Sequence, residues 1–445
     1  MEKIGGVRLL SAFAVLLAGS ACVDDAKDPV LAETIALDRH ELVLQIGAQE
    51  TLVAAVAPEQ AADRRVSWVS SDETVATVSG QGVVCALAVG RAVISACAAG
   101  QTACCTVDVT ASKGIYAAGV VRSSAGRNVA VVWQDGVAEY LTDGTQDAAA
   151  RSVSVTPGGD VYVAGFVDDG QRNTACLWKN GVVRNLSVAG RDAQALSLCI
   201  ADDGTVYVAG YETNSEGVCE ARVWSDPAGS EVTLELPATD SYATAVCMSS
   251  VGGRPCVAGY MQKEDGVNTC GVFWRDGERD NFPEFQTGHV GSRADALCVA
   301  FNNEDRRDDF YAAGSEFVRE SYNPRAVFFL HNLISQLQGS NRPGMALAVG
   351  LYDGDFYTAG WALYSETKQE ACVWRNHEEL YRLTSSDAYG SHAYALCITS
   401  DGKIYAGGYE LLDRTQSPVI WLNGERFAVL DTRTELGTVY GMFVR

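Results

Sequence analysis

Six residues with aromatic, imidazole or guanidinium side chains stand in segments of variable length within a repeated sequence. They are Arg191, Tyr242, His289, Tyr389, His392 and Tyr440. Aromatic rings with polar edges can stack on a glycan and hydrogen-bond to it, or can form the hot spot of a protein interface. We take these six as candidate ligand-binding residues; the alternative is that each is ordinary loop surface or packing between repeats.

Motifs for covalent or metal chemistry are absent from the sequence. It contains no His-Glu-x-x-His, no Gly-x-Ser-x-Gly, no Gly-Lys-Ser/Thr phosphate loop and no Cys-x-x-Cys, and its five histidines lack ligand spacing. We therefore predict a protein that is not an enzyme and that has no metal and no cofactor. The alternative is a polysaccharide hydrolase or lyase with two nearby carboxylates, drawn from Asp192, Asp240 and Asp295.

A different chemistry, covalent lipidation, is indicated at Cys22. Lys3 and Arg8 precede an apolar segment, and Ala18-Gly19-Ser20-Ala21 lies directly before the cysteine. A charged start, a short apolar segment and small residues are typical of a secretory signal. The small residues before Cys22 resemble a bacterial lipobox, in which the cysteine is lipidated and becomes the new N-terminus. The alternative is signal cleavage nearby that leaves a free thiol.

This resemblance divides the N-terminus into a lipoprotein signal peptide, residues 1–21, and a tether, residues 22–32. The residues after the cysteine, Val23-Asp24-Asp25, are similar to acidic tags that route some Gram-negative lipoproteins to the outer face of the outer membrane. Elsewhere the chain lacks a run of about 20 apolar residues. We expect a bacterial outer-membrane lipoprotein, exposed at the surface, whose only membrane contact is its lipid.

Composition limits the fold and the partners. The chain has 445 residues, 44 of them glycine, and a formal net charge of −22. Such an acidic surface repels phosphate backbones, so we expect no nucleic-acid partner. Many glycines and few charged helix formers favour an all-β protein. We expect a monomer.

Residues 33–110 contain short β-patterned segments with turn signals between them. The segments are 42–46, 51–56, 66–68, 75–78, 83–86, 92–96 and 106–109. About seven strands in some 80 residues are typical of an immunoglobulin-like sandwich. Trp68-Val69-Ser70-Ser71-Asp72, Val75-Ala76-Thr77-Val78 and Cys105-Thr106-Val107-Asp108-Val109 resemble the bacterial Ig-like group 2 family. That resemblance implies a spacer or adhesion module.

From Gly114 to Arg445 one unit repeats seven times, at intervals of 45 to 55 residues. Its marker is a strand ending in Ala-Gly or Gly-Gly, which begins at Tyr116, Tyr162, Tyr207, Cys256, Tyr311, Tyr357 and Tyr405. A second marker follows at Trp133, Trp178, Trp224, Trp274, Phe329, Trp374 and Trp421. Such periods with several short strands are the signature of propeller blades.

Side-chain size predicts the order of strands within a blade, because seven strands crowd a propeller axis. One column is small in every repeat: Ser152, Ser197, Ala245, Ala296, Ala346, Ala395 and Gly441. We therefore predict that this strand is innermost, and that the C-terminal strand 439–444 completes the blade that begins at 115–120. The fold class is all-β: an Ig-like β-sandwich, then a seven-bladed β-propeller over residues 114–445.

The units Tyr162-Val163-Ala164-Gly165 and Trp178-Lys179-Asn180-Gly181 resemble bacterial β-propeller-repeat proteins. The repeats lack the Trp-Asp pairs of WD40 proteins and the Ser-x-Asp-x-Gly-x-Thr-Trp box of sialidases. We expect a non-enzymatic binding or adhesion protein whose propeller loop face recognises a glycan or a surface protein. The remaining alternative to these partners is an envelope scaffold in a multi-protein assembly.

Nine cysteines lie in the repeats, several of them in a column of small residues. The innermost and third strands of a blade are about 9–10 Å apart, which is too far for a disulfide. We expect buried free thiols at these positions, with bridges between adjacent blades as the alternative.

Overall fold

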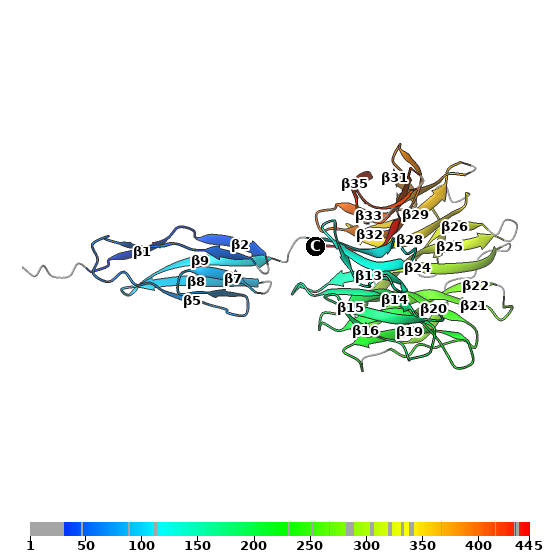
Figure 1. Cartoon of the computed structure of the whole chain (residues 1–445), viewed down its shortest axis with the longest axis horizontal. Coiled ribbons are helices and arrows are strands. Elements are labelled where there is room, and N and C mark those ends of the chain that lie inside the picture. Colours follow the sequence, from blue (N-terminus) through cyan, green and yellow to red (C-terminus); the bar gives the residue numbers. More distant parts are fainter. Residues whose placement is uncertain are drawn as a thin grey trace, which may run out of the picture. The chain divides into compact units, whose positions relative to one another are not determined.

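The computed structural model describes residues 31–445 except 46–47, 88–89, 111–113, 230–231, 251–252, 267, 282–288, 303–306, 319–322, 331–332, 338–341, 366, 414, 431 and 433–435. Every helical or strand element among the described residues is a β-strand (Figure 1). The chain divides into two compact units, one holding most of the residues up to Asp108 and one running from Val109 to Arg445. Cys22, the predicted lipidation site, lies outside the described residues.

The N-terminal unit has nine described strands in three groups. They are β1 (Thr34–Leu37), β2 (Glu41–Gln45), β3 (Gln49–Thr51), β4 (Ala54–Ala57), β5 (Ser67–Ser70), β6 (Ala76–Val78), β7 (Val83–Ala86), β8 (Gly90–Ala98) and β9 (Gln101–Thr110). The pairing orders are β2-β9-β8-β5, β3-β7-β6 and β1-β4. The sequence predicted seven strands; β1 and β3 were missed because they are short and largely exposed, and so carry no clear alternation.

The C-terminal unit pairs its described strands into seven antiparallel sheets, which we number along the chain. Sheet 1 contains β36 (Gly437–Val444), β10 (Ile115–Arg122), β11 (Asn128–Gln134) and β12 (Val137–Tyr140). Sheet 2 contains β13 (Asp147–Val155), β14 (Val161–Asp168), β15 (Asn173–Lys179) and β16 (Val182–Asn185). Sheet 3 contains β17 (Ala193–Ile200), β18 (Val206–Thr213) and β19 (Cys219–Asp226).

Sheets 4 to 7 follow the same order of strands. Sheet 4 contains β20 (Ser241–Met248), β21 (Pro255–Gln262), β22 (Thr269–Arg275) and β23 (Glu278–Asn281). Sheet 5 contains β24 (His289–Asn302), β25 (Arg307–Val318), β26 (Pro324–Leu330) and β27 (Leu333–Gln336). Sheet 6 contains β28 (Gly344–Tyr352), β29 (Asp355–Leu363), β30 (Gln369–Arg375) and β31 (Glu378–Arg382). Sheet 7 contains β32 (Ala388–Ile398), β33 (Ile404–Leu412), β34 (Thr415–Leu422) and β35 (Glu425–Val429).

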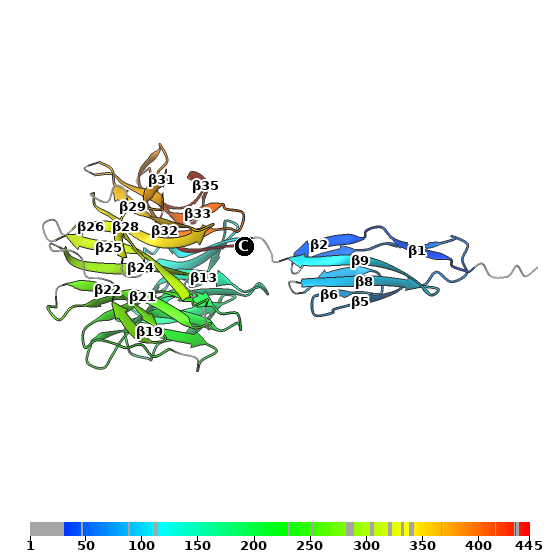
Figure 2. The ribbon, with the colours of Figure 1, turned by 180° about the vertical axis from the view of Figure 1, so that it is seen from behind.

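One edge strand of each sheet meets the edge strands of the neighbouring sheets. These edge strands are β36, β13, β17, β20, β24, β28 and β32. Each contacts the next along the chain from β13 to β32, then β32 contacts β36, and β36 contacts β13. β36 pairs with β10 in register from Ile115 opposite Val444 to Val121 opposite Gly437. Figures 1 and 2 show the sheets following one another from cyan to red in sequence order.

Apolar side chains fill the spaces between consecutive sheets. Tyr116 and Val132 of sheet 1, for example, pack with Val163 and Trp178 of sheet 2. The second-marker residues Trp133, Trp178, Trp274, Phe329, Trp374 and Trp421 are fully buried. Burial of such rings contributes to the hydrophobic stabilisation of each interface.

The glycine of the Tyr-x-Ala-Gly marker allows the edge strand to bulge. A Cβ on Gly165 would overlap the carbonyl oxygen of Ala149, and one on Gly360 would overlap that of Met345. The edge strand inserts one extra residue just past this close approach, for example between Ala150 and Ser152. The marker glycine is therefore required by its sheet partner, and it fixes where the extra residue stands.

The bulge also corrects one part of the predicted register. In sheet 6 the residue opposite Ala359 is Ala348, which corresponds to Ser152 opposite Ala164 in sheet 2. The predicted small column placed Ala346 there, which is wrong by two residues. Ala346 lies before the bulge, opposite Gly360.

Candidate functional site

The seven bulges place one unpaired strand residue of each sheet in a common layer. These bulge residues are Tyr440, Arg151, Leu196, Thr244, Asp295, Leu347 and Tyr394. Together with the residues two positions earlier in the edge strands, and with the residue that follows each marker glycine, which is aromatic in five of the seven sheets, they form what we call the axial layer. Because the edge strands follow one another from sheet to sheet, this layer draws on all seven sheets.

Three of the predicted ligand-binding residues, Tyr242, His392 and Tyr440, lie in the axial layer. The His392 ring stacks on Trp361 of the preceding sheet, with centroids 4.8 Å apart, and lies 5.1 Å from the Tyr409 ring. Tyr440 meets Tyr394 edge-on at 5.3 Å. These contacts join sheets 6, 7 and 1 through aromatic rings.

A second group of rings lies on sheets 3 and 4. Tyr242 stacks on Tyr260 with centroids 4.8 Å apart and meets Tyr211 edge-on at 5.0 Å. Tyr260 and Tyr409 lie directly opposite Tyr242 and His392 in the same sheet. Tyr211 and Trp361 reach these residues from the preceding sheet, a contact that the sequence could not show because it crosses between sheets.

Two arginines of the axial layer were not predicted. Arg151 lies over the Tyr440 ring at 4.3 Å and over Phe166 at 5.6 Å. Arg293 lies over the Tyr260 ring at 4.2 Å, and its Nη2 donates to Asp295 Oδ1 at 3.2 Å. Each guanidinium thus has one face on a tyrosine ring, a favourable cation–π arrangement.

Burial keeps the rings of this layer uncharged. His392 donates from Nε2 to Gln369 Oε1 at 2.7 Å, and its Nδ1 accepts from the Tyr394 hydroxyl at 3.3 Å, which is the neutral tautomer. Burial lowers the pKa of His392 to about 4. Burial likewise raises the pKa of the Tyr242, Tyr260 and Tyr394 hydroxyls. Near neutral pH these side chains are therefore neutral hydrogen-bonding groups.

Four buried polar atoms of the layer have no hydrogen-bond partner among the described residues. They are Arg151 Nε, Arg293 Nε, Asp295 Oδ2 and Ser315 Oγ. Ser315 lies opposite Arg293 in the β24–β25 pair, and Asp295 follows Arg293 by two residues. Three of the four atoms therefore lie in sheet 5. Burial raises the pKa of Asp295, and the charge of Arg293 opposes that rise. Each buried polar atom without a partner lowers the free energy of unfolding by about 1–3 kcal/mol. Because the layer contains such atoms, it is polar as well as aromatic.

The other predicted binding residues lie elsewhere or outside the described part. Arg191 donates from Nη1 to Oε1 of the buried Glu212 at 2.7 Å, so its guanidinium is engaged within sheet 3. Tyr389 is on β32 and 65% exposed. His289 begins β24, but its side chain lies outside the described residues.

Two of the three candidate acids, Asp192 and Asp240, accept hydrogen bonds that connect neighbouring sheets. Asp192 accepts from the backbone N–H of Asn173 at 2.8 Å, and Asp240 accepts from that of Cys219 at 2.8 Å. Each joins the start of one edge strand to the third strand of the sheet before it. Asp147 does the same with Asn128 at 2.7 Å. This recurrence identifies a scaffold contact at Asp192 and Asp240.

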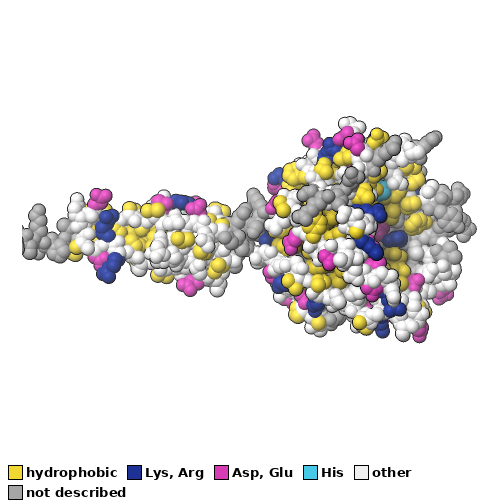
Figure 3. All heavy atoms as spheres, viewed as in Figure 1, with side chains coloured by type: hydrophobic (Ala, Val, Ile, Leu, Met, Phe, Trp, Pro, Cys, Tyr) yellow, Lys and Arg dark blue, Asp and Glu magenta, His cyan; other side chains and the backbone are white. Residues whose placement is uncertain are grey.

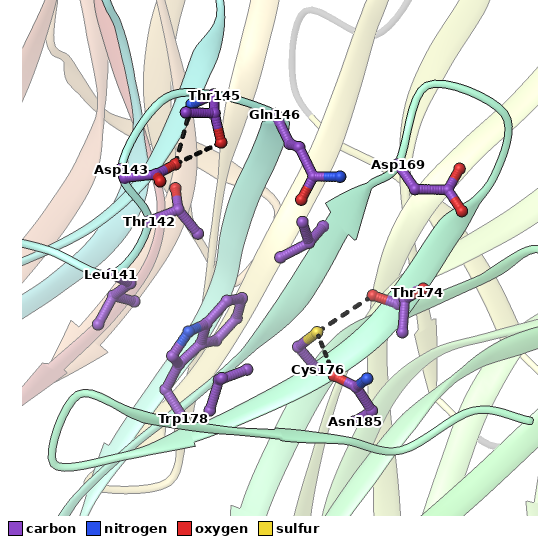
Figure 4. A pocket seen from close by; sticks show the side chains of 12 residues that line it. Leu141, Thr142, Asp143, Thr145, Gln146, Asp169, Thr174, Cys176, Trp178 and Asn185 are labelled. Carbon is purple, nitrogen blue, oxygen red and sulfur yellow. Dashed lines mark hydrogen bonds between the residues drawn. The ribbon is translucent and has the colours of Figure 1, made fainter. Parts of the chain in front are cut away.

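Cavities also lie between neighbouring sheets, away from the axial layer. One, of about 500 Å³, is bounded by the loop after β12 and by β14 to β16 (Figure 4). Asp143 accepts there from Thr145, and Cys176 donates to Thr174 and Asn185. Thr145 lowers the pKa of Asp143, and burial raises the pKa of Cys176 to about 12. The acid is therefore ionised near neutral pH, whereas the thiol is protonated and unreactive.

The corresponding interfaces between sheets 2 and 3 and between sheets 3 and 4 hold cavities of about 340 and 470 Å³. Arg191 and Glu212 line the former. On the face in view, Figure 3 shows basic side chains among hydrophobic ones and a histidine over the C-terminal unit. Among the described residues, no group of His, Cys, Asp and Glu is arranged to hold a metal, and no helix is long and apolar enough to span a membrane.

Comparison with known proteins identifies the N-terminal unit. Residues 32–107 match the bacterial Ig-like domain (group 2) family. Over 89 residues, 19% of this chain, the sequence is 37% identical to an uncharacterised protein of Clostridium acetobutylicum. The match spans 9% of that protein's length. The chain therefore carries an N-terminal Ig-like domain of this group.

Solved structures similar to the chain include propellers. A quinonprotein alcohol dehydrogenase-like protein from Bacteroides thetaiotaomicron is 11% identical, with 91% of this chain and 96% of that one covered and a TM-score of 0.38. The Dos1 propeller is 11% identical, with 72% and 74% covered and a TM-score of 0.37.

Proposed function

We propose that this protein is a cell-surface binding protein whose axial layer recognises a glycan. The aromatic rings around His392 and Tyr440, neutral near pH 7, carry the proposal. Sugar rings stack on such faces, and their hydroxyls need both donors and acceptors. Arg151, Arg293 and Asp295 supply these groups beside the rings. A protein ligand that inserts a polar loop is the alternative partner.

The fold proposed for the C-terminal unit, residues 114–445, is a seven-bladed β-propeller closed by the C-terminal strand. The seven sheets, the cycle of edge-strand contacts and the pairing of β36 with β10 support it. The Ig-like domain, residues 33–110, serves in this proposal as the spacer between a tether at 22–32 and the propeller. We further propose that Cys22 carries the lipid that anchors a monomer to the bacterial outer membrane.

Glycan-array binding, followed by calorimetric titration of the hits, tests the recognition proposal. The chain without its predicted signal should bind saturably, and Tyr440→Ala should weaken binding about fivefold, because a lost aromatic contact is worth about 1 kcal/mol. Val182→Ser on β16 is the control, because that side chain is 73% exposed and outside the axial layer. Absence of saturable binding, or unchanged affinity in a folded Tyr440→Ala protein, would overturn the proposal.

One observation favours a second candidate, a polysaccharide hydrolase or lyase. Burial raises the pKa of Asp295, as a general acid requires. If this candidate is right, a polysaccharide that binds the chain is cleaved, and Asp295→Asn abolishes cleavage in a protein that still folds. Binding without cleavage in the parent chain excludes it.

A further inference from the structure

Sheet 4 departs from the other sheets at one marker position, and this places two cysteines opposite each other. Cys256 occupies the marker position that is tyrosine in the other six repeats. Directly opposite on the edge strand β20 stands Cys247, in the register that also pairs Val246 with Val257. In sheets 3, 5 and 7 the corresponding edge-strand cysteine faces the marker tyrosine instead: Cys199 faces Tyr207, Cys298 faces Tyr311 and Cys397 faces Tyr405.

Directly opposite residues of antiparallel strands have Cα atoms about 4.5–5.5 Å apart. A disulfide needs about 4.4–6.8 Å, so this pair meets the requirement without movement of the backbone. The distance that rules out a link between the innermost and third strands does not apply here, because β20 and β21 are adjacent.

We propose that Cys247 and Cys256 form a cross-strand disulfide when the chain folds in an oxidising compartment. Each thiol loses a proton and together they give two electrons to a disulfide-bearing oxidant, which is reduced to two thiols as the new S–S bond forms. The present structure shows the thiol form, as it does for each of the thirteen cysteines it describes.

Burial of the two thiols determines when during folding this bond can form. Cys256 is 1% exposed, and burial raises its pKa to about 12. Burial and the nearby thiols Cys298, Cys256 and Cys199 raise the pKa of Cys247 well above its ordinary value. Thiolate attack is therefore slow once the sheets have packed, so oxidation belongs to the stage at which β20 and β21 pair. The link does not depend on what the axial layer binds.

Cys199 and Cys298, on the edge strands of sheets 3 and 5, are the competing partners of Cys247. A link to either would be a bridge between sheets. The two cases can be separated by peptide mapping, because trypsin does not cut between Arg254 and Pro255. The peptide 223–263 therefore contains Cys247 and Cys256 and no other cysteine.

The test uses the full chain exported to an oxidising compartment, quenched in acid, alkylated under denaturing conditions, and alkylated with a second reagent after reduction. Peptide 223–263 should carry the second label at both cysteines and should weigh two hydrogens less before reduction. Reductant should lower the Tm by about 4 °C, as expected for a loop of about ten residues in a domain of this size.

Two variants taken from the repeats themselves are the controls. Cys256→Tyr restores the residue of the other six sheets, and Cys247→Ser introduces the residue that sheet 2 has at Ser154, opposite Tyr162. In each variant the remaining thiol should take the first label, and the Tm should no longer depend on reductant. First-label alkylation of both cysteines in the parent chain, or a link to Cys199 or Cys298, overturns the proposal.

Discussion

The framework of the seven sheets and their axial layer differ in how strictly they repeat. Marker glycines and buried second-marker rings recur from sheet to sheet with few exceptions, because each is fixed by a close contact within or between sheets. The bulge residues range from Leu196 to Arg151, Asp295 and Tyr440. The backbone is thus held by one set of positions, and the proposed recognition rests on another set, whose residue type varies from sheet to sheet.

Removal of β36 tests the framework of the seven sheets and should have the largest effect. Deletion of residues 438–445 removes the strand that pairs with β10 and contacts β13 and β32. We expect loss of the cooperative thermal transition of the C-terminal unit, measured by calorimetry. An unchanged Tm in the deleted chain would show that β36 does not complete sheet 1 and would remove the basis for the axial layer.

Truncation of a buried framework ring should come next in size. Trp274 is fully buried and donates from Nε1 to the Glu235 carbonyl oxygen at 2.9 Å. Trp274→Ala should lower the free energy of unfolding by about 4 kcal/mol, because it leaves a cavity and an unpaired carbonyl. Trp224→Ala in sheet 3 should cost less, because that ring is only partly buried. Equal urea-denaturation losses at the two sites would contradict the expected difference.

The marker glycine can be tested with a matched pair in one sheet. Gly165→Ala places a methyl group against the Ala149 carbonyl oxygen, whereas Gly158→Ala meets Thr156 Oγ1 at 3.7 Å, an ordinary contact. We expect a loss of about 3 kcal/mol in the first variant and no loss in the second, measured by urea denaturation. Similar stabilities in the two variants would mean that the bulge tolerates a side chain at the marker.

The smallest expected effect comes from the axial layer and depends on pH. His392 has a pKa of about 4 in the folded chain, below its ordinary value of 6.5, because burial favours the neutral ring. Between these values the unfolded chain binds a proton that the folded chain does not. Stability is therefore complete above about pH 6.5 and falls by about 2 kcal/mol as the pH decreases to about 5.

His392→Phe keeps a ring against Trp361 and removes the titration, so its denaturation free energy should change less between pH 7 and pH 4.5 than that of the parent chain. Parallel pH profiles for the two proteins would show that the ring is not held neutral.

The sequence predicted the repeated unit and the order of strands because glycine, tryptophan and alanine mark positions that backbone contact and burial determine. It could not predict the register exactly. In sheet 6, Ala346 and Ala348 are both small and stand two residues apart, so the alternating pattern could not distinguish them, and the small column was placed two residues too early.

The structure brings some of the candidate residues together and separates others. Tyr242, His392 and Tyr440 lie in one layer, but Arg191 is paired with Glu212, a contact that depends on which strands are neighbours. Arg151 was not among the candidate residues, and Asp295 was considered only as a candidate acid. One signal could have placed them: each bulge residue stands between two small or β-branched residues, as in Ala150-Arg151-Ser152 and Ala294-Asp295-Ala296.

The bulge has a practical consequence for protein engineering. The unpaired residue of each edge strand is not opposed by a strand partner, so its side chain can be exchanged with little effect on the pairing around it. Simultaneous randomisation of these seven codons would give a combinatorial library on one fixed scaffold. Such a library could be selected for new small-molecule sensors.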